Sequence, residues 1–263
     1  RDDRLGVGPA RLAAAYFTGG WYLRVYGIPA QERTAGVSDL LTIILAASGL
    51  AMLIFAGWWL LIASEGVYLG RRVVILLYDW FASRYDGVKE FRHEYEHRFL
   101  AQPIMQFIAP NKTPLMLDVA TGTGRLPMAM IRHPQFYGQV IGVDLSLAML
   151  RQAQSKFTDD PRVLLAQSPA EQLPFADNSF DVVTCLEALE FIVNQHAALA
   201  EMCRVLKPGG MILITHRINT RWMPRKTYSE ADYAELLLDA GFDEIHFRFW
   251  QVDYQQAWAI KPA

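Results

Sequence analysis

The sequence predicts an α/β fold in which helices cover a doubly wound, mostly parallel sheet of seven strands with an antiparallel strand at the carboxyl end. Three observations carry this prediction. An apolar segment at Leu115–Val119 is followed at once by a glycine-rich turn and a helix-forming stretch. From there on, short apolar segments alternate with amphipathic ones. The last two apolar segments are separated by a short turn, which is typical of an antiparallel pair.

The first 110 residues do not fit this pattern. Residues 1–39 mix arginines, glycines and aromatic residues without a lasting period, which predicts an irregular arm. Leu40–Ser64 contains no Asp, Glu, Lys, Arg or His over 25 residues, whereas about 20 apolar residues suffice to cross a bilayer. A core helix of this length would be expected to show a polar face, and the apolar region of a signal peptide is shorter. We therefore expect one transmembrane helix at residues 40–64.

Residues 65–110 are expected to form connecting and lid helices. The stretch VVILLYDWF (73–81) is apolar and aromatic, so it would lie along a membrane interface or cap the next domain. In Val88–Ile108 apolar residues recur at three- and four-residue steps. This spacing predicts one amphipathic helix with a solvated charged face.

The α/β domain is expected at residues 111–263. Its predicted strands are Leu115–Val119, Val140–Val143, Val163–Ala166, Phe180–Leu186, Met211–Thr215, Phe242–Trp250 and Tyr254–Ile260. Its predicted helices are Arg125–Arg132, Ser146–Phe157, Asn194–Leu206 and Ser229–Ala240. The serines are typical N-caps, and Gly241 holds the usual position after a helix end. The breaker Lys207-Pro208-Gly209-Gly210 ends the third of these helices.

The turn after the first strand has the residues of a ligand site. Gly122 and Gly124 allow the backbone to approach a ligand beyond the carboxyl ends of the strands. The dinucleotide fingerprint needs a third glycine where this chain has Pro127. Asp118 places a carboxylate near the turn, which disfavours a pyrophosphate and suits a cation. Asp144 follows Gly124 by 20 residues and can accept both ribose hydroxyls, unless it only caps the next helix. A ligand with an adenosine and a positive charge, such as S-adenosylmethionine, fits best.

Five stretches of the chain resemble one family. They are YDWFASRYD (78–86), LDVATGTGR (117–125), VIGVDLSLAML (140–150), AEQLPFADNSFDVV (170–183) and RVLKPGG (204–210). In this order they are similar to the class I S-adenosylmethionine-dependent methyltransferases, in the ubiquinone/menaquinone-methyltransferase-like branch. The resemblance runs from Tyr78 to the end of the chain. It implies a Rossmann-like sheet and S-adenosylmethionine as cofactor, and it is weak for the substrate.

The resemblance also implies which residues contact the cofactor. The first strand and its turn would hold the methionine part, the end of the second strand the ribose, and later loops the adenine and the sulfonium. The expected cofactor-binding residues are Asp118, Ala120, Thr121, Gly122, Gly124, Asp144, Leu145, Met149, Ala170, Glu171, Cys185, Leu186 and, from the lid, Tyr85. One position departs from the family pattern. Pro169 stands where relatives usually have an Asp or Asn that reads the adenine.

Methyl transfer is an in-line displacement at a carbon that the sulfonium already activates, so the protein mainly aligns the nucleophile and excludes water. A base is needed only if the acceptor must lose a proton. Glu187, Glu190, His196 and His216 lie on or near the carboxyl edge of the predicted sheet and are candidates. Each is also a typical capped or surface polar group, so the catalytic residues stay open.

Charge, cysteine content and motifs limit the classes of molecule that the protein is expected to bind. A net charge of −2 gives no electrostatic case for nucleic acid. Cys185 and Cys203 form no C-x-x-C pair and have no histidine cluster nearby, so we expect neither a disulfide nor a metal site. The Asn-Pro-Pro-Tyr motif of many amino-group methyltransferases is absent, which argues against nucleic-acid or protein amines.

These features together predict a membrane-anchored methyltransferase with a small lipophilic acceptor: a quinone ring first, then a lipid amine or a pigment oxygen. Because the cofactor is made in the cytoplasm, the carboxyl-terminal domain of this single-pass protein is expected to face it. The alternative is an accessory or scaffolding subunit of a membrane complex with little or no turnover. In both cases the bilayer is a partner, and other membrane subunits are partners in the second.

Overall fold

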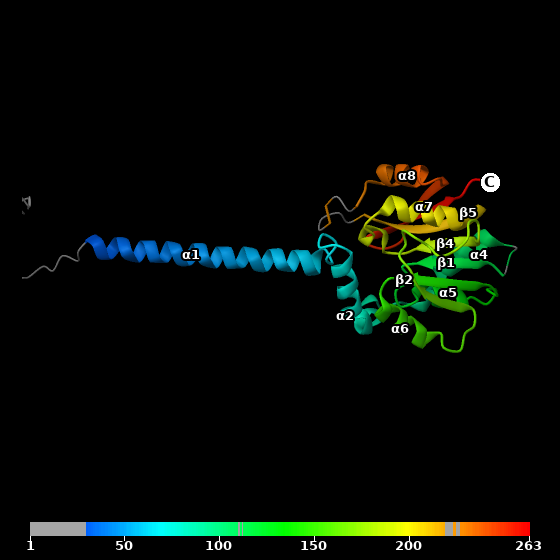
Figure 1. Ribbon diagram of the computed structural model, residues 1–263, viewed down its shortest axis with the longest axis horizontal. Coiled ribbons are helices and arrows are strands. Elements are labelled where there is room, and N and C mark those ends of the chain that lie inside the picture. The colour runs from blue at the N-terminus through cyan, green and yellow to red at the C-terminus, as the bar shows by residue number, and fades with distance from the viewer. Residues whose placement is uncertain (1–29, 110, 112, 219–222, 225–226) are drawn as a thin grey trace, which may run out of the picture. The chain divides into compact units, whose positions relative to one another are not determined.

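The computed structural model describes residues 30–109, 111, 113–218, 223–224 and 227–263 of the chain. The chain divides into two compact units, Arg1–Met52 and Leu53–Ala263. Figure 1 shows the helices and strands, many of them labelled.

Helix α1 covers Ala30–Trp58 and continues into the π-helical turn η1, Trp59–Ala63. From Gly36 to Ala63 it is long and apolar enough to span a membrane, with a mean hydropathy of 2.3. The described apolar side chains of this span are largely exposed. The helix begins ten residues earlier than the expected span, so the last part of the predicted arm is helical. Residues 1–29 of that arm lie outside the described residues.

The second unit contains a seven-stranded sheet with the order β3-β2-β1-β4-β5-β7-β6. The strands are β1 (Leu115–Val119), β2 (Gln139–Asp144), β3 (Val163–Gln167), β4 (Phe180–Cys185), β5 (Leu206–Arg217), β6 (Asp243–Phe249) and β7 (Tyr254–Ile260). All neighbours pair in parallel except β7, which is antiparallel to both β5 and β6. The predicted doubly wound sheet with its antiparallel final strand is therefore confirmed.

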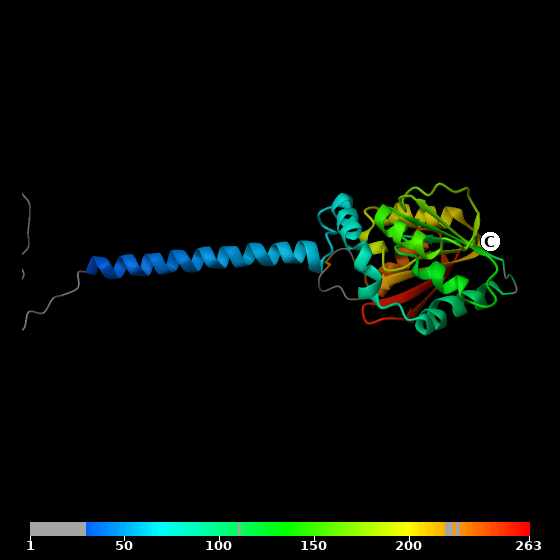
Figure 2. The ribbon, with the colours of Figure 1, turned by 90° about the horizontal axis from the view of Figure 1, so that it is seen from below.

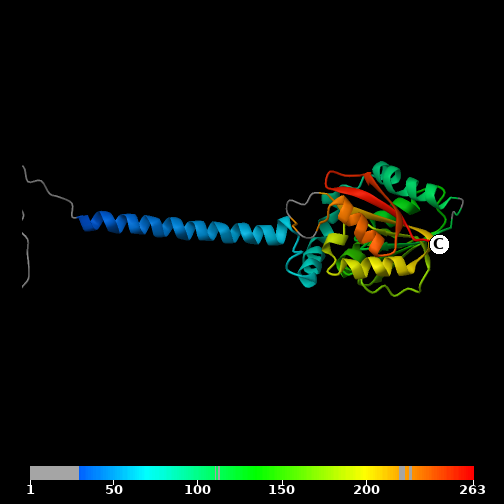
Figure 3. The ribbon, with the colours of Figure 1, turned by 90° about the horizontal axis from the view of Figure 1, so that it is seen from above.

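Helices cover both faces of the sheet. The helices of the sheet region are α5 (Arg125–Ile131), α6 (Leu147–Lys156), η3 (Leu189–Phe191), α7 (Gln195–Val205) and α8 (Glu230–Asp239). Figures 2 and 3 show α7 and the helical segment 93–108 on opposite sides of the sheet. Alternate residues of β1 separate the two cores: Leu117 packs with Leu199 of α7, whereas Met116 packs with Leu126 of α5 and Ile104. Burial on both faces explains why the parallel strands are continuous apolar runs.

The lid region differs from the prediction. Helix α2 runs from Arg71 to Lys89 and ends at Glu90, whose backbone is left-handed. A second helical segment follows, made of α3 (His93–Glu96), the π-helical turn η2 (His97–Ala101) and α4 (Gln102–Ile108). The predicted single helix over Val88–Ile108 is therefore wrong at its start. The apolar spacing continues across residues 90–92, but the helix is broken there because Glu90 is left-handed and Arg92 is extended.

The breaker before the fifth strand also behaves differently. β5 begins at Leu206 and passes through Pro208, Gly209 and Gly210. The N–H of Gly209 donates to the carbonyl of Lys261 at 2.8 Å, and the N–H of Lys261 donates to the carbonyl of Gly210 at 3.0 Å. The end of the chain thus supplies partners that make this segment an extension of the strand.

Candidate active site

The turn after β1 leaves open space next to its backbone. Ala120, Gly122 and Gly124 all have positive φ, at 55°, 55° and 86°. A Cβ on Gly124 would lie 2.4 Å from the ring of Phe157, so the packing of α6 requires glycine there. A Cβ on Gly122 would meet nothing within 4 Å. Gly122 therefore borders free volume, as a backbone that receives a ligand should.

Asp144 ends β2 and faces this turn. Its Oδ2 accepts a hydrogen bond from the N–H of Gly122 at 2.8 Å, and its Oδ1 accepts one from the N–H of Ser146 at 2.8 Å. Burial raises its pKa, while the backbone donors act in the opposite direction. Each carboxylate oxygen keeps a lone pair after these bonds, so Asp144 can still accept hydroxyls from a ligand.

Asp118 is more deeply buried than Asp144. It lies opposite Thr184 in the parallel pair of β1 and β4, and the Thr184 hydroxyl donates to its Oδ1 at 2.6 Å. The Thr121 hydroxyl donates to its Oδ2 at 2.6 Å. Burial raises its pKa to about 6, against the lowering effect of these two hydroxyls. A cation in the adjoining pocket would favour the ionised form of Asp118.

A cavity of about 840 Å³, counting its solvent-open part, lies at the carboxyl ends of β1, β2 and β4. Its polar lining includes Asp144, Ser146 and Glu171, and a smaller pocket beside it is lined by Asp118, Thr121 and Gly122. Helix α2 borders the cavity through Val74, Ile75, Tyr78 and Tyr85, while Phe191, Ile192 and Val193 border it from the chain after β4. The site therefore has a polar part at the strand ends and an apolar part beneath the lid.

Polar contacts along its whole length hold α2 over the strand ends. At its start Arg71 pairs with Glu171. In the middle Asp79 accepts hydrogen bonds from the hydroxyl of Ser146 and the N–H of Ala148. Near its end Asp86 accepts from Thr123 and pairs with Lys156. Figure 1 shows α2 beside α6, in agreement with these contacts.

Arg125 links the lid to the sheet at the methionine end of the expected cofactor site. Its Nε and Nη2 donate to the two carboxylate oxygens of Glu96 at 2.8 Å each, and its Nη1 donates to Glu187 at 2.6 Å. The guanidinium lies between the rings of Phe91 and Trp250, at 4.7 and 4.6 Å from their centroids. Arg125 thus joins α3, the lid loop, the β4–η3 loop and the β6–β7 turn.

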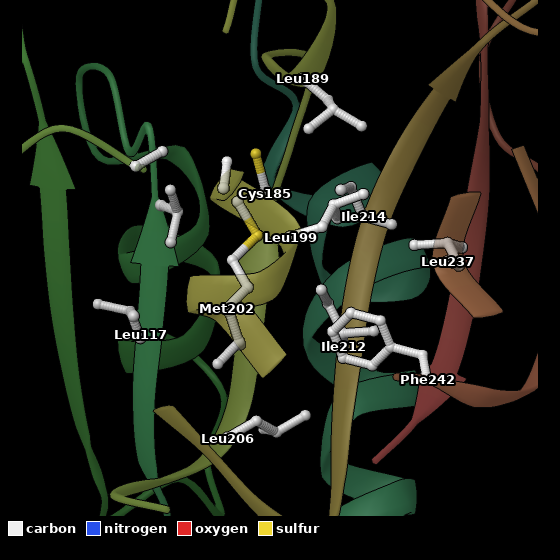
Figure 4. Close-up of a cluster of buried hydrophobic side chains, with 14 of the residues drawn as sticks. Leu117, Cys185, Leu189, Leu199, Met202, Leu206, Ile212, Ile214, Leu237 and Phe242 are labelled. Carbon is white, nitrogen blue, oxygen red and sulfur yellow. The ribbon is translucent and has the colours of Figure 1, made fainter. Parts of the chain in front are cut away.

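The structure brings most of the expected cofactor residues together. Those that line the cavity or its adjoining pocket are Tyr85, Asp118, Ala120, Thr121, Gly122, Asp144, Leu145, Met149, Ala170, Glu171 and Leu186. Two do not. Gly124 instead supports the packing of Phe157, and Cys185 is buried among Leu199, Ile214 and neighbouring core side chains (Figure 4).

The expected base candidates lie in different surroundings. Glu187 lines the cavity, but although burial alone would raise its pKa, Lys89 and Arg125 hold it below the usual value. Glu190 is buried, accepts from Tyr254 and Arg217, and has a pKa raised by burial. His216 has both ring nitrogens engaged, with the carbonyl of Tyr228 and the side chain of Gln255. None of these hydrogen bonds or ion pairs involves a residue that lines the apolar part of the cavity.

Sequence reasoning missed several lining residues. Val74, Ile75 and Tyr78 lie on the lid helix, and Phe191 and Val193 follow β4. The apolar stretch 73–81 was a usable signal for the first three, but no local pattern indicates which side of that stretch faces the cavity. Arg125 was predicted as part of a helix and was given no role, because its hydrogen-bond partners Glu96 and Glu187 lie 29 and 62 residues away in sequence.

Residues 117–214 match the model of a methyltransferase domain, and this range runs from within β1 to within β5 and includes the turn, Asp144 and most of the cavity. The chain contains a methyltransferase domain. Together with the curated relatives described below, the match supports the class I S-adenosylmethionine-dependent group that the motifs indicated. It also bears out S-adenosylmethionine as the cofactor, and Gly122 and Asp144 leave the open space and the acceptor atoms that such a ligand needs.

The curated relatives of this domain include demethylmenaquinone and ubiquinone/menaquinone methyltransferases. The chain is 37% identical over 141 residues to a demethylmenaquinone methyltransferase of Porphyromonas gingivalis. The aligned residues cover 52% of this chain and 58% of that protein. It is 33% identical over 147 residues to a ubiquinone/menaquinone biosynthesis C-methyltransferase of Idiomarina loihiensis, covering 55% and 59%. The chain therefore matches somewhat more than half the length of these relatives.

Solved structures agree with the fold. A S-adenosylmethionine-dependent methyltransferase from Aquifex aeolicus superposes with a TM-score of 0.54 at 21% identity, covering 66% of this chain and 95% of that one. At this identity the likeness concerns the fold alone.

Proposed function

We propose that the chain is a membrane-anchored methyltransferase that transfers a methyl group from S-adenosylmethionine to a small lipophilic acceptor, with a quinone-type ring as the first candidate. The observation that carries this proposal is the cavity itself. It joins the Asp144 turn to an apolar compartment under α2 that is lined by Val74, Ile75, Phe191 and Val193. A ring with an isoprenoid tail is the kind of acceptor that such a lining desolvates.

S-adenosylmethionine supplies an activated methyl group, so the chain's own residues need to orient the cofactor and the acceptor and to exclude water from them. We propose that Asp144 holds the ribose and that Asp118 and the 120–122 turn hold the cationic amino-acid part. Leu145, Met149 and Ala170 flank the adenine in this assignment. Because Pro169 has no side-chain donor or acceptor, the neighbouring Ser168, which lines the cavity, would take over a polar contact to the base.

An acceptor carbon or hydroxyl that gains a methyl group must lose a proton. Tyr78 lines the cavity, and its hydroxyl donates to Oε2 of Glu65 at 2.9 Å. Burial, followed by the nearby Glu65 charge, raises the pKa of Tyr78 well above its usual value, so the hydroxyl stays protonated. We propose that Tyr78 takes the acceptor's proton as it passes its own to Glu65, whose side chain is 41% exposed and can release it to water.

The membrane anchor is the helix within residues 36–63, which corresponds to the expected span at 40–64. In this proposal residues 65–110 form the lid, residues 111–263 form the catalytic domain, and that domain faces the cytoplasm. The alternative is a scaffolding subunit of a membrane complex. It would keep the cofactor pocket but lack turnover.

The test combines binding and turnover. Isothermal titration of the detergent-solubilised chain with S-adenosylmethionine should give binding that Asp144→Ala abolishes, while Cys203→Ser, outside the cavity, leaves it unchanged. Membranes supplied with methyl-labelled cofactor should then show label in quinones. Label in lipid amines but not in quinones would exclude the ring acceptor, and binding without any labelled product would favour the scaffold.

The proton route has a separate test. Tyr78→Phe keeps the ring that lines the cavity and removes the hydroxyl. It should lower kcat at least tenfold while the cofactor affinity changes little. An unchanged kcat would exclude Tyr78 from the route.

A further inference from the structure

We infer that the outward face of α2 rests on the membrane surface, so that the lid of the cavity is itself a lipid-binding element. This inference rests on the proposed membrane anchor. We call this face the α2 outer stripe and define it as Arg72, Leu76, Trp80 and Arg84.

The outer stripe is exposed and amphipathic in the way that an interfacial helix requires. Its members follow at four-residue steps, which places them along one side of the helix. Leu76 is 67% and Trp80 68% exposed, and one helical turn apart they form an exposed apolar patch of the kind that marks a binding surface. The guanidinium of Arg84 lies 5.6 Å from the centroid of the Trp80 ring.

The two sides of α2 are occupied differently. Tyr78 and Tyr85 face the cavity, and Asp79 is bound to Ser146 and Ala148. The carboxylate of Asp79, next to Trp80 in sequence, is therefore engaged by the start of α6, and the stripe presents two arginines. Trp and Leu flanked by Arg suit the headgroup region of a bilayer, where the arginines are attracted to anionic lipid.

Chain length keeps the stripe near the membrane if α1 spans it. The helical part of the span ends at Ala63 and α2 begins at Arg71. Fully extended, that linker would reach at most about 29 Å. It is shorter than this, because Gly66 and Leu69 are held in turns by the carbonyls of Leu60 and Gly66. The ring of Tyr68 also stacks on Trp59 at 5.1 Å, so the linker folds back toward the end of the span.

The docked helix would connect the membrane to the reaction. The same helix that meets the lipid through Leu76 and Trp80 borders the apolar compartment through Val74 and Ile75. A lipophilic acceptor could then pass from the bilayer into the cavity along α2 without crossing water. We therefore expect docking to matter for acceptors dissolved in lipid and not for short-chain acceptors dissolved in water.

The test uses the full chain in nanodiscs that contain phosphatidylglycerol. A fluorophore is placed at Leu76→Cys in a Cys203→Ser background, since Cys185 is buried. Lipids with a nitroxide near the headgroup should quench it. Ile54→Cys in α1 reports insertion of the span, and Leu238→Cys, exposed on α8, is the matched control that should not be quenched.

The outcomes separate this inference from the anchor. Quenching at positions 54 and 76 but not 238 supports it. Quenching at 54 alone, with the label at 76 reached by aqueous iodide or covered by a protein partner, overturns the inference and leaves the anchor in place. No quenching at either position overturns the anchor as well.

A second variant tests the same inference through the rate of methyl transfer. Leu76→Glu with Trp80→Glu should lower the rate on a long-chain quinone in the nanodisc at least fivefold. The rate on a water-soluble short-chain quinone and the affinity for S-adenosylmethionine should stay unchanged. An equal loss on both quinones would overturn the inference.

Discussion

Replacing Arg125 with methionine should lower the stability of the catalytic domain more than any surface charge replacement. The guanidinium makes two hydrogen bonds of 2.8 Å to Glu96 and one of 2.6 Å to Glu187. The Arg125 side chain is 12% exposed, and those of Glu96 and Glu187 are 7% and 6% exposed. Methionine fills a similar volume but leaves the carboxylates buried.

Removing one partner of a buried ion pair costs about 3–5 kcal/mol, because the remaining charge has lost its compensation. Loss of the cation–π contacts with Phe91 and Trp250 adds to this, whereas Lys89 still compensates Glu187 at 2.6 Å. We therefore expect a loss of about 4 kcal/mol. For a domain of this size it corresponds to a fall in Tm of roughly 8–16 °C.

The assay is thermal unfolding of the detergent-solubilised chain, followed by circular dichroism. Arg125→Lys should lie between wild type and Arg125→Met, because a lysine keeps the charge but cannot form the paired bonds to Glu96. Lys207→Met is the surface control: Lys207 is 42% exposed and pairs with Asp181, so its loss should stay below about 1 kcal/mol. A fall in Tm for Arg125→Met no larger than that of Lys207→Met would refute the reasoning.

Further predictions concern the turn and the buried aspartate. Gly124→Ala should cost about 1–3 kcal/mol in a melting experiment, because its Cβ would meet Phe157; Gly122→Ala should cost only about 1 kcal/mol of backbone strain and should instead weaken cofactor binding at least tenfold in a titration. The opposite pattern would contradict the open space assigned to Gly122. The folded-state pKa of Asp118 is raised from 3.8 to about 6, so the folded state binds a proton more tightly than the unfolded one. As the pH rises from about 4 to 6, the unfolding free energy of wild type should therefore fall relative to that of Asp118→Asn, by up to about 3 kcal/mol. A pH-independent difference between the two proteins would count against the raised pKa.

The strands were predictable to within a residue or two in most of the sheet. β1 was predicted with the bounds that it has, β2 extends one residue further at each end, and β3 extends one residue further at its carboxyl end. These strands are buried on both faces, so a short apolar run marks them directly. Ser146 and Ser229 cap α6 and α8 through their hydroxyls, as expected from local chemistry. The same reasoning failed at Gly209. This residue belongs to a strand because its N–H donates to the carbonyl of Lys261, which is far away in sequence.

Local signals alone therefore determined the order of strands and helices, the glycine turn, Asp144 and the apolar segment that precedes the domain. Each of these depends on residues close together in the chain, where spacing and side-chain type fix the conformation. Only the tertiary structure decided that Cys185 belongs to the core, that Glu187 is held by Arg125 and Lys89, and that α2 has one face to the cavity and one to the outside. Those properties depend on contacts between residues far apart in sequence, and burial and charge pairing at such contacts leave no periodic mark in the sequence.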